Sequence, residues 1–296
     1  MSTTTQAPAW MGRPTVAVRA LKAVALGVVV LLVLFPLWTV LATSLASPQN
    51  VIDNGGWVIW PTEFSFDAYG DILAGGIITR ALVISTGITL VGTALSLACT
   101  IALAYTLSRP KVYGGKPMLL LVLFTFLFPP GMVPLFLVVQ SAGLVDNYAA
   151  LILPFLINVF NLVVMRGFFQ SIPQELIDAA RMDGAGELAI LRKVVLPLSK
   201  AVIAVIGLFY AVSYWNRFFE AIIYFNDQSK WPIGTVLRQY VTGGASLSET
   251  AGEMATASPQ SVQMAVVILA TLPIVCVYPF LQRYFAKGVL TGALKA

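Results

Sequence analysis

Six long apolar runs limit the folds open to this chain more than any other feature does. They cover approximately residues 22–45, 80–107, 118–140, 148–169, 199–226 and 262–285. Each provides the roughly 20 residues that a helix needs to cross a bilayer core about 30 Å thick. Charged residues make up only 10% of the chain, against roughly 25% in soluble domains. Because the runs are continuous rather than alternating, we expect an all-α membrane protein with six transmembrane helices.

The first run resembles a signal peptide, because basic residues precede it and Ser44–Ser47 ("SLAS") is similar to a small-residue cleavage site. Its apolar core, however, spans residues 23–45, whereas the core of a signal peptide has roughly 7–15 residues. An uncleaved transmembrane helix is therefore favoured.

The composition argues against several kinds of site. The chain has no histidine, and its two cysteines, Cys99 and Cys276, lie inside apolar runs. Neither a metal site nor a disulfide framework is indicated, and we expect both thiols to be small buried hydrophobes. "GGKP" at Gly114–Pro117 lacks the spacing and the Ser or Thr of a phosphate-binding loop. We expect no directly bound cofactor and no enzyme activity; any ATP would be bound by another polypeptide.

Basic residues are biased to one side of the predicted membrane, and such a bias marks the cytoplasmic side. That side holds 14 of the 18 Lys and Arg residues: Arg13, Arg19, Lys22, Arg109, Lys111, Lys116, Arg166, Arg181, Arg192, Lys193, Lys200, Arg283, Lys287 and Lys295. The outer side holds Arg80, Lys230 and Arg238 together with Asp53, Glu63, Asp67, Asp71, Asp146, Asp227, Glu249 and Glu253. We therefore expect cytoplasmic tails at 1–21 and 286–296, a transmembrane domain at 22–285, and no nucleic-acid partner.

Residues 175–198, "ELIDAARMDGAGELAILRKVVLPL", interrupt the apolar chain with a charged, Ala-rich segment on the cytoplasmic side. Ser171–Gln174 ("SIPQ") suggests a capping box that starts a helix, with Pro173 in its first turn. Gly184 has the conformational freedom to stop that helix with a positive φ. A second short helix, "ELAILRKVV", then leads to the next apolar run.

Two interpretations of this segment are open. It is either an amphipathic linker on the lipid headgroups or a docking element for a cytosolic protein. Ala179 and Ala180 leave one face flat enough for the close approach of a partner backbone. Glu175 and Asp178 disfavour an anionic lipid surface, where basic flanks are expected. The docking interpretation is therefore the stronger one.

The spacing of this segment resembles the EAA loop of ABC importer permeases, whose pattern is E-A-A, three residues, G, nine residues, I, one residue, L-P. Here Asp178-Ala179-Ala180 is followed by three residues and Gly184, then nine residues to Val194, one more, and Leu196-Pro197. Asp178 and Val194 depart conservatively from the pattern. The resemblance implies contact with an ATPase through these residues: Glu175, Asp178, Ala179, Ala180, Asp183, Gly184, Val194, Leu196 and Pro197.

The resemblance extends along most of the chain. "GTALSLACTIALAYTLSRP", "FFQSIPQELIDAARMDGA", "YWNRFFEAIIYFND" and "PFLQRYFAKGVLTGALKA" are similar to permeases of maltose-type carbohydrate ABC importers, in the LplC/YtcP-like polysaccharide or oligosaccharide branch. This implies a type I, MalG-like fold in a bacterial inner membrane. It also implies a second homologous permease, two cytosolic ATPase subunits that bind ATP and Mg²⁺, and an extracytoplasmic sugar-binding protein or lipoprotein.

The fifth run contains "WNRFFEA", which places Arg217 and Glu220 at membrane depth. Such residues usually face a bundle interior or an aqueous cavity. Separated by three positions, they would share one helical face and neutralise each other. They form either a structural pair or part of a sugar path, where charged groups would bind hydroxyls or a uronate. The candidate path residues are Tyr214, Trp215, Asn216, Arg217 and Glu220, although the aromatic residues are equally suited to packing or to lipid.

Other functions remain open from the sequence. The EAA loop also occurs in importers for other solutes, and six spans could form half of a secondary transporter. A channel subunit or a non-transporting scaffold is a further alternative. No matching hydropathy repeat is visible, and these last classes leave the EAA-like spacing unexplained.

Overall fold

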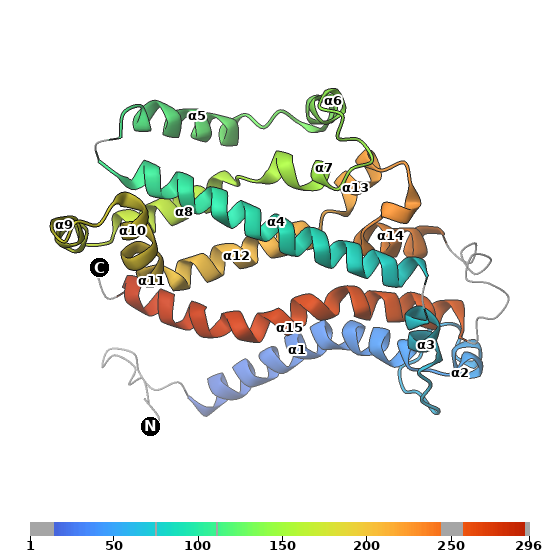
Figure 1. Ribbon diagram of the computed structural model, residues 1–296. Coiled ribbons are helices and arrows are strands. Elements are labelled where there is room, and N and C mark those ends of the chain that lie inside the picture. Colours follow the sequence, from blue (N-terminus) through green and yellow to red (C-terminus); the bar gives the residue numbers. More distant parts are fainter. Residues whose placement is uncertain (1–14, 75, 111, 244–256, 294–296) are drawn as a thin grey trace. The chain divides into compact units, whose positions relative to one another are not determined.

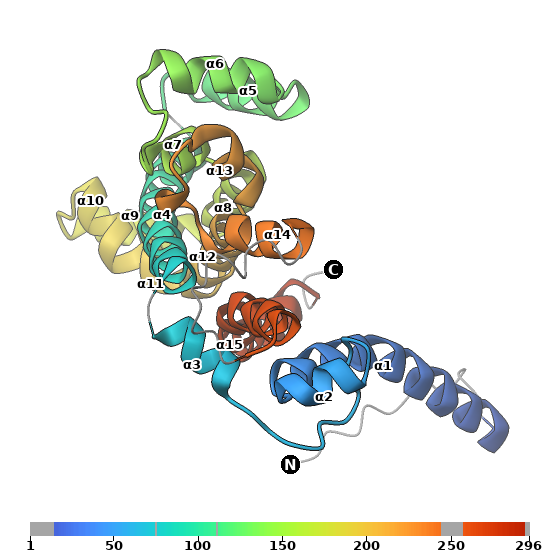
Figure 2. The same ribbon diagram turned by 90° about the vertical axis from the view of Figure 1, so that its right-hand side faces the viewer.

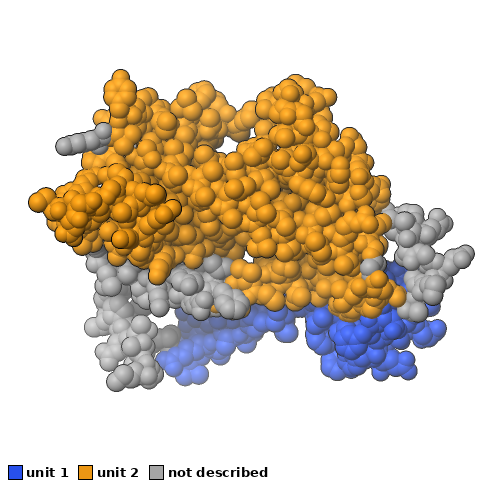
Figure 3. All heavy atoms as spheres, in the orientation of Figure 1, with its two compact units in different colours: residues 1–68, 256–265 blue, residues 69–255, 266–296 orange. Residues whose placement is uncertain are grey.

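The computed structural model describes residues 15–74, 76–110, 112–243 and 257–293. The chain divides into two compact units, residues 1–68 with 256–265 and residues 69–255 with 266–296 (Figure 3). Within the described ranges the regular structure is helical, and the only β-type pairing is an isolated bridge between Ala46 and Phe64. The predicted all-α class is therefore confirmed.

Three helices are long and apolar enough to cross a bilayer by themselves. They are α1 (Val16–Ser44), α4 (Ile77–Ser108) and the Pro259–Val277 part of α15 (Pro259–Ala293). Three bent pairs also qualify if each pair forms one span, so the described chain has between three and six candidate spans. The pairs are α5 (Gly115–Leu127) with α6 (Met132–Ser141), bent by 118°; Ala149–Phe155 with α8 (Val159–Gln170), bent by 49°; and Glu187–Leu198 with α12 (Lys200–Trp215), bent by 85°.

The helices of the third, fourth and fifth runs are therefore broken or sharply bent. Between α5 and α6, Pro129 and Pro130 provide no N–H for a helix, and Gly131 takes a φ of 79°. In the fourth run Leu153–Phe155 forms a 3₁₀ turn, after which the Asn158 side chain accepts a hydrogen bond from the N–H of Asn161 and starts α8. These local features break the helices without ending the apolar runs.

The remaining elements are short; some of them make up the Ala149–Phe155 and Glu187–Leu198 halves of the bent pairs, and the others connect the spans. They are α2 (Pro48–Asp53), α3 (Asp67–Leu73), α7 (Ala149–Ile152), η1 (Leu153–Phe155), α9 (Gln174–Met182), α10 (Glu187–Ile190), the π-helical turn η2 (Leu191–Val195), α11 (Leu196–Leu198), α13 (Phe218–Tyr224), η3 (Gln228–Lys230) and α14 (Ile233–Gly243). Figure 1 shows α9–α11 at one end of α12 and α13–α14 toward its other end. Figure 2 shows α5 and α6 set apart from α4, α8 and α12.

In the first unit, α1 exposes an apolar surface along almost its whole length and is buried only at Ala42, Thr43 and Ser44. There Thr43 Oγ1 accepts a hydrogen bond from the N–H of Val58 at 3.0 Å. The Ser47 side chain caps α2 by accepting a bond from Asn50 N–H. Such an exposed apolar helix suits a lipid environment, where water does not penalise apolar surface.

In the second unit, α4 packs against α8 and α12 (Figure 1). Gly92, Ser96 and Thr100 lie four residues apart and therefore share one face of α4. Ser96 Oγ is 2.7 Å from Tyr214 Oη, and Thr100 Oγ1 is 2.7 Å from Tyr210 Oη. Two buried hydroxyl pairs thus join α4 to α12.

The two cysteine thiols lie in different environments. Cys99 is half-buried and Cys276 is exposed, which corrects the expectation that both are buried.

Candidate functional site

The charged segment adopts the helix–turn–helix form expected from its sequence, but the expected capping box is absent. Ser171 ends α8 in a helical conformation, and its hydroxyl donates a hydrogen bond back to the carbonyl of Phe168 at 2.8 Å. Pro173 occupies the position before α9, with no side-chain cap. Gln174 Nε2 instead donates to Asp178 Oδ1 at 3.0 Å. The hydroxyl of Ser171 is directed to the preceding helix, so it is not free to cap the next one.

Gly184 makes the turn that the sequence predicts, with a φ of 79°. The N–H of Ala185 donates to the carbonyl of Ala180, and that of Gly184 donates to the carbonyl of Arg181, both at 2.9 Å. These two bonds form a Schellman motif, which satisfies carbonyls left free at the end of α9. Because such a motif requires a left-handed residue after the helix, glycine is the residue type that fits with least strain.

The second short helix departs from the simple helix expected, because residues 191–195 form a π-helical turn. Pro197 follows closely and has no N–H to donate to the carbonyl four residues before it. Widened turns of this kind are frequent at functional sites. The irregular turn joins α10 to α11 directly ahead of α12.

Apolar residues fix the segment to the second unit while its charged and small residues stay accessible. Ile177, Ile190 and Val195 are buried. The residues proposed from the EAA resemblance are exposed or half-buried: Glu175, Asp178, Ala179, Asp183, Gly184 and Pro197 are exposed, and Ala180, Val194 and Leu196 are half-buried. The apolar side chains of Leu176 and Met182 are also exposed. The accessible surface therefore combines small, apolar and acidic groups.

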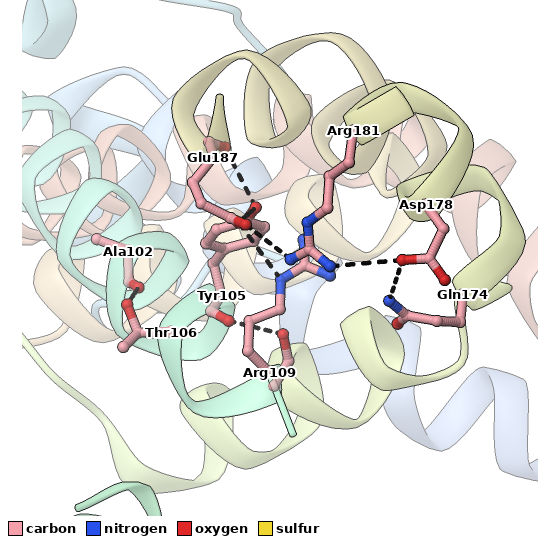
Figure 4. Close-up of polar contacts among 9 residues, drawn as sticks. Ala102, Tyr105, Thr106, Arg109, Gln174, Asp178, Arg181 and Glu187 are labelled. Carbon is pink, nitrogen blue, oxygen red and sulfur yellow. Dashed lines mark hydrogen bonds and ion pairs between the residues drawn. The ribbon is translucent and has the colours of Figure 1, made fainter. Parts of the chain in front are cut away.

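Glu187 joins both short helices to the end of α4 (Figure 4). Its Oε2 accepts a hydrogen bond from Tyr105 Oη at 2.5 Å, and its Oε1 lies 2.7 Å from Arg181 Nη2. The Tyr105 hydroxyl, followed by the Arg181 guanidinium, holds the pKa of the Glu187 carboxyl below its usual range. One carboxylate of α10 thus contacts side chains of both α4 and α9.

Two further contacts extend this cluster. Arg109 lies with its Cζ 4.2 Å from the centre of the Tyr105 ring and its Nε 3.9 Å from Glu187 Oε2. Arg181 Nη1 reaches Asp178 Oδ1 at 3.4 Å (Figure 4). Sequence reasoning missed Tyr105, Arg109 and Glu187, because Tyr105 and Glu187 are separated by 82 positions. The one indication of the cluster in the sequence is the pair of opposite charges, Arg181 and Glu187, on the two sides of the Gly184 turn.

The predicted pair of Arg217 and Glu220 does form, with Arg217 Nη1 3.4 Å from Glu220 Oε1. The two residues do not lie within one continuous helix, however. The α12 helix ends at Trp215, and Arg217 precedes α13 with a ψ of 57°. The break corrects the expectation that both residues lie on the face of one helix, while the short chain separation still brings the two charges together.

A cavity of about 390 Å³ lies beside Arg217. Its walls come from the segment before α8, from α8 itself, from α12 and from the break after α12: Pro154, Phe155, Ile157, Asn158, Phe160, Asn161, Phe209, Tyr210, Ser213 and Arg217. Of the path residues expected from the sequence, only Arg217 lines this cavity. Glu220 does not.

The other three expected path residues lie elsewhere. Tyr214 is buried with its hydroxyl against Ser96, and Trp215 is buried with its Nε1 donating to the carbonyl of Ala270 at 2.8 Å. Asn216 is exposed, and its Nδ2 donates to the carbonyl of Val212 at 2.8 Å. Both aromatic residues thus take the packing alternative.

Comparison with known proteins identifies the family. Residues 100–291 match the family model described as "Binding-protein-dependent transport system inner membrane component". The chain belongs to this family. It is therefore the membrane-embedded permease component of such a transport system, and the resemblance on which the sequence interpretation depended is confirmed.

Individual relatives agree with this assignment. The chain is 46% identical to the polygalacturonan/rhamnogalacturonan transport system permease protein YtcP of Bacillus subtilis, over 90% of this chain and 93% of YtcP. It is 45% identical to the protein LplC of the same organism, over 91% and 92% of the two chains. A solved bacterial ABC transporter involved in the import of the acidic polysaccharide alginate has a chain with a TM-score of 0.85 and 32% identity, matching 92% of this chain and 99% of that one.

Proposed function

We propose that this permease is a subunit of an ATP-driven importer that takes up oligosaccharides or polysaccharide fragments. The observation that carries the substrate class is the 46% identity, over 90% of the chain, to a permease named for polygalacturonan and rhamnogalacturonan transport. The similarity to a structure from an alginate importer supports it. On this proposal the chain forms the translocation path with a second, homologous permease.

The proposed topology has six spans, with each bent helix pair contributing one, and both termini in the cytoplasm. In the third pair only α12 enters the membrane, and Glu187–Leu198 stays on the cytoplasmic side. The distribution of Lys and Arg supports this orientation. The proposed tails, residues 1–21 and 286–296, are only partly described by the structure. Five of the charged residues used for the orientation lie outside the described residues: Arg13, Lys111, Glu249, Glu253 and Lys295. A bacterial inner membrane is the proposed location.

The proposed coupling element is α9–α11. Two cytosolic ATPase subunits bind ATP and Mg²⁺, and one of them seats α9 of this chain in a surface groove. The exposed Ala179, Leu176 and Met182 offer small and apolar surface for that contact. The link from Glu187 to Tyr105 of α4 gives the contact a rigid connection to a membrane span. An extracytoplasmic binding protein delivers the sugar.

Transport by the reconstituted system tests this proposal. Proteoliposomes would contain this chain with the second permease, the ATPase and the binding protein encoded in the same gene neighbourhood. ATP would be enclosed in the vesicles in one set of experiments and added outside them in another. We expect radiolabelled trigalacturonate or a neutral oligosaccharide to move only in the direction set by the binding protein and only with ATP. Movement of sugar down its gradient without ATP would favour a channel or secondary transporter. ATP-driven movement of amino acids or peptides alone would assign another solute class.

A further inference from the structure

The cavity beside Arg217 has an unusual lining for a space among membrane helices. It combines one cation with the amides of Asn158 and Asn161, the hydroxyl of Ser213 and the aromatic rings of Phe155 and Phe209. Among the described residues that line it, none is acidic. Its volume of about 390 Å³ falls within the range of small-molecule sites, about 300–1,000 Å³. The cavity therefore presents a positive charge together with polar groups and ring faces.

The guanidinium of Arg217 is held in place by its neighbours. Its Cζ lies 3.5 Å from the centre of the Phe155 ring and 5.1 Å from that of Tyr214. The side chain is only 12% exposed. Aromatic faces attract a guanidinium and restrict its rotation. The cation is thus positioned before any ligand arrives.

The hydrogen-bonding capacity of this guanidinium is mostly unused. Nη2 donates to Ser213 Oγ at 3.2 Å, and Nη1 contacts Glu220 Oε1 at 3.4 Å. The buried Nε has no hydrogen-bond partner among the described residues. A guanidinium carries five N–H groups, so two long contacts leave it poorly satisfied. Such a group at membrane depth is costly unless a further acceptor completes it.

A carboxylate is the acceptor that fits best. Its two oxygens match the planar fork of a guanidinium, and the resulting bidentate pair is stronger than a bond to a neutral hydroxyl. Glu220 balances the charge when no ligand is bound, and it does so without lining the cavity. The neighbouring amides and rings suit the hydroxyls and the apolar faces of a pyranose.

We propose that this cavity binds a uronate unit of the transported sugar, with Arg217 pairing with its carboxylate. The proposal rests on the proposed function, since it assumes that a sugar passes through this permease. It assigns Arg217 as the residue that makes the permease prefer acidic over neutral oligosaccharides. The chemistry required is recognition only, and no bond is formed or broken.

The test measures ATP-driven uptake by the complete transporter, with trigalacturonate and galactotriose as the acidic and neutral probes. Arg217→Gln should lower trigalacturonate uptake roughly 10- to 100-fold, the effect of losing a charged hydrogen-bonded pair. Arg238→Gln is the matched control, because it removes an exposed positive charge that does not line the cavity. That control should transport both probes as the unmodified protein does.

Two variants at Glu220 separate recognition from a structural role. If Arg217 matters only as the partner of Glu220, the double variant Arg217→Gln/Glu220→Gln should regain trigalacturonate uptake, and Glu220→Gln alone should lose it. Our proposal expects the reverse: the double variant stays deficient, while Glu220→Gln keeps or increases uptake. All variants are first checked for assembly with the second permease and the ATPase.

The outcomes distinguish this inference from the proposed function. An unmodified transporter that moves galactotriose but not trigalacturonate would overturn the uronate site and leave sugar import intact. If the unmodified transporter moves neither probe, the result contradicts the proposed function as well as the uronate site. Full trigalacturonate uptake by assembled Arg217→Gln, or recovery in the double variant, would also overturn the inference.

Discussion

The ring of Tyr214 lies against Gly92, so closely that a Cβ added at Gly92 would come within 2.8 Å of the ring carbon Cζ. The same tyrosine places its hydroxyl 2.7 Å from Ser96 Oγ, one turn farther along α4. The lack of a side chain at Gly92 therefore allows α12 to approach α4 and to bring the buried hydroxyls together. The packing of the two spans depends on this contact.

Gly92→Ala should consequently destabilise the protein. Overpacking of a close contact costs about 1–3 kcal/mol, more than the gain of up to about 1 kcal/mol from replacing glycine in a helix. Gly87→Ala is the control on the same helix, because no atom lies within 4 Å of its added Cβ. Thermal unfolding of the purified complex should show a lower midpoint for Gly92→Ala only. Equal midpoints for the two variants would contradict the contact.

Glu187→Gln should loosen α9 and α10 from α4. The variant removes the negative charge that pairs with Arg181 and weakens the bond from Tyr105. Hydrogen exchange of the amides in residues 174–190 should become faster, while Glu175→Gln, at an exposed acid of the same segment, should leave it unchanged. If exchange is the same in both variants, the Glu187 cluster does not hold the segment.

The same cluster predicts a dependence on pH. The pKa of Glu187 is lowered in the folded protein, first by the Tyr105 hydroxyl and then by Arg181. A lowered folded pKa means that the stabilisation is complete above the unfolded value of about 4.3 and is lost as pH falls through the folded value. After correction for the intrinsic pH dependence of amide exchange, protection of residues 174–190 should therefore stay constant from neutral pH down to about 4.3 and fall below that. A loss of protection already near neutral pH would contradict this assignment.

Substitutions in the α9–α10 turn test the proposed coupling. Gly184→Leu places a Cβ at a φ of 79°, which costs roughly 1 kcal/mol or more and should misplace α10. Gly186→Ala is the control, because Gly186 has a φ of −70° and no atom within 4 Å of an added Cβ. We expect Gly184→Leu to assemble with the second permease but to retain the ATPase poorly or to hydrolyse ATP without uptake.

Ala179→Trp distinguishes docking from a lipid-surface position, because Ala179 is exposed whereas Ala180 packs against the core of this unit. A helix seated in an ATPase groove has no room for an indole, whereas a helix lying on lipid accepts one readily. We expect loss of ATPase co-purification or of uptake in this variant. Full uptake with unchanged co-purification would exclude the docking interpretation.

Thiol labelling tests the orientation of the chain. After replacement of Cys99 and Cys276, a cysteine at Asp53 should react with an impermeant reagent added outside intact cells. A cysteine at Lys287 should react only after the membrane is opened. Outside labelling of Lys287→Cys would exclude the model with both termini in the cytoplasm.

Short-range rules account for the parts of the candidate site that the sequence predicted well. Gly184 is left-handed because a Schellman turn requires it, and that turn is built from residues only a few positions apart. Arg217 and Glu220 contact each other because three positions along the chain keep them close even where the helix breaks. The six apolar runs likewise follow from composition alone, since lipid selects apolar side chains without reference to their neighbours.

Tertiary structure decided which of these residues face one another, because those choices depend on distances between remote segments. The aromatic ring of Tyr214 is of the type that binds sugars, but in the structure the ring packs against Gly92 and its hydroxyl pairs with Ser96 of α4. The hydroxyl of Ser171 was suited to start α9 but already bonds within α8. Tyr105 reaches Glu187 only because α4 ends beside α10, and Arg217 lines a cavity only because α8 and α12 leave one there. Local chemistry set what each side chain was able to bind, and packing set which partner it met.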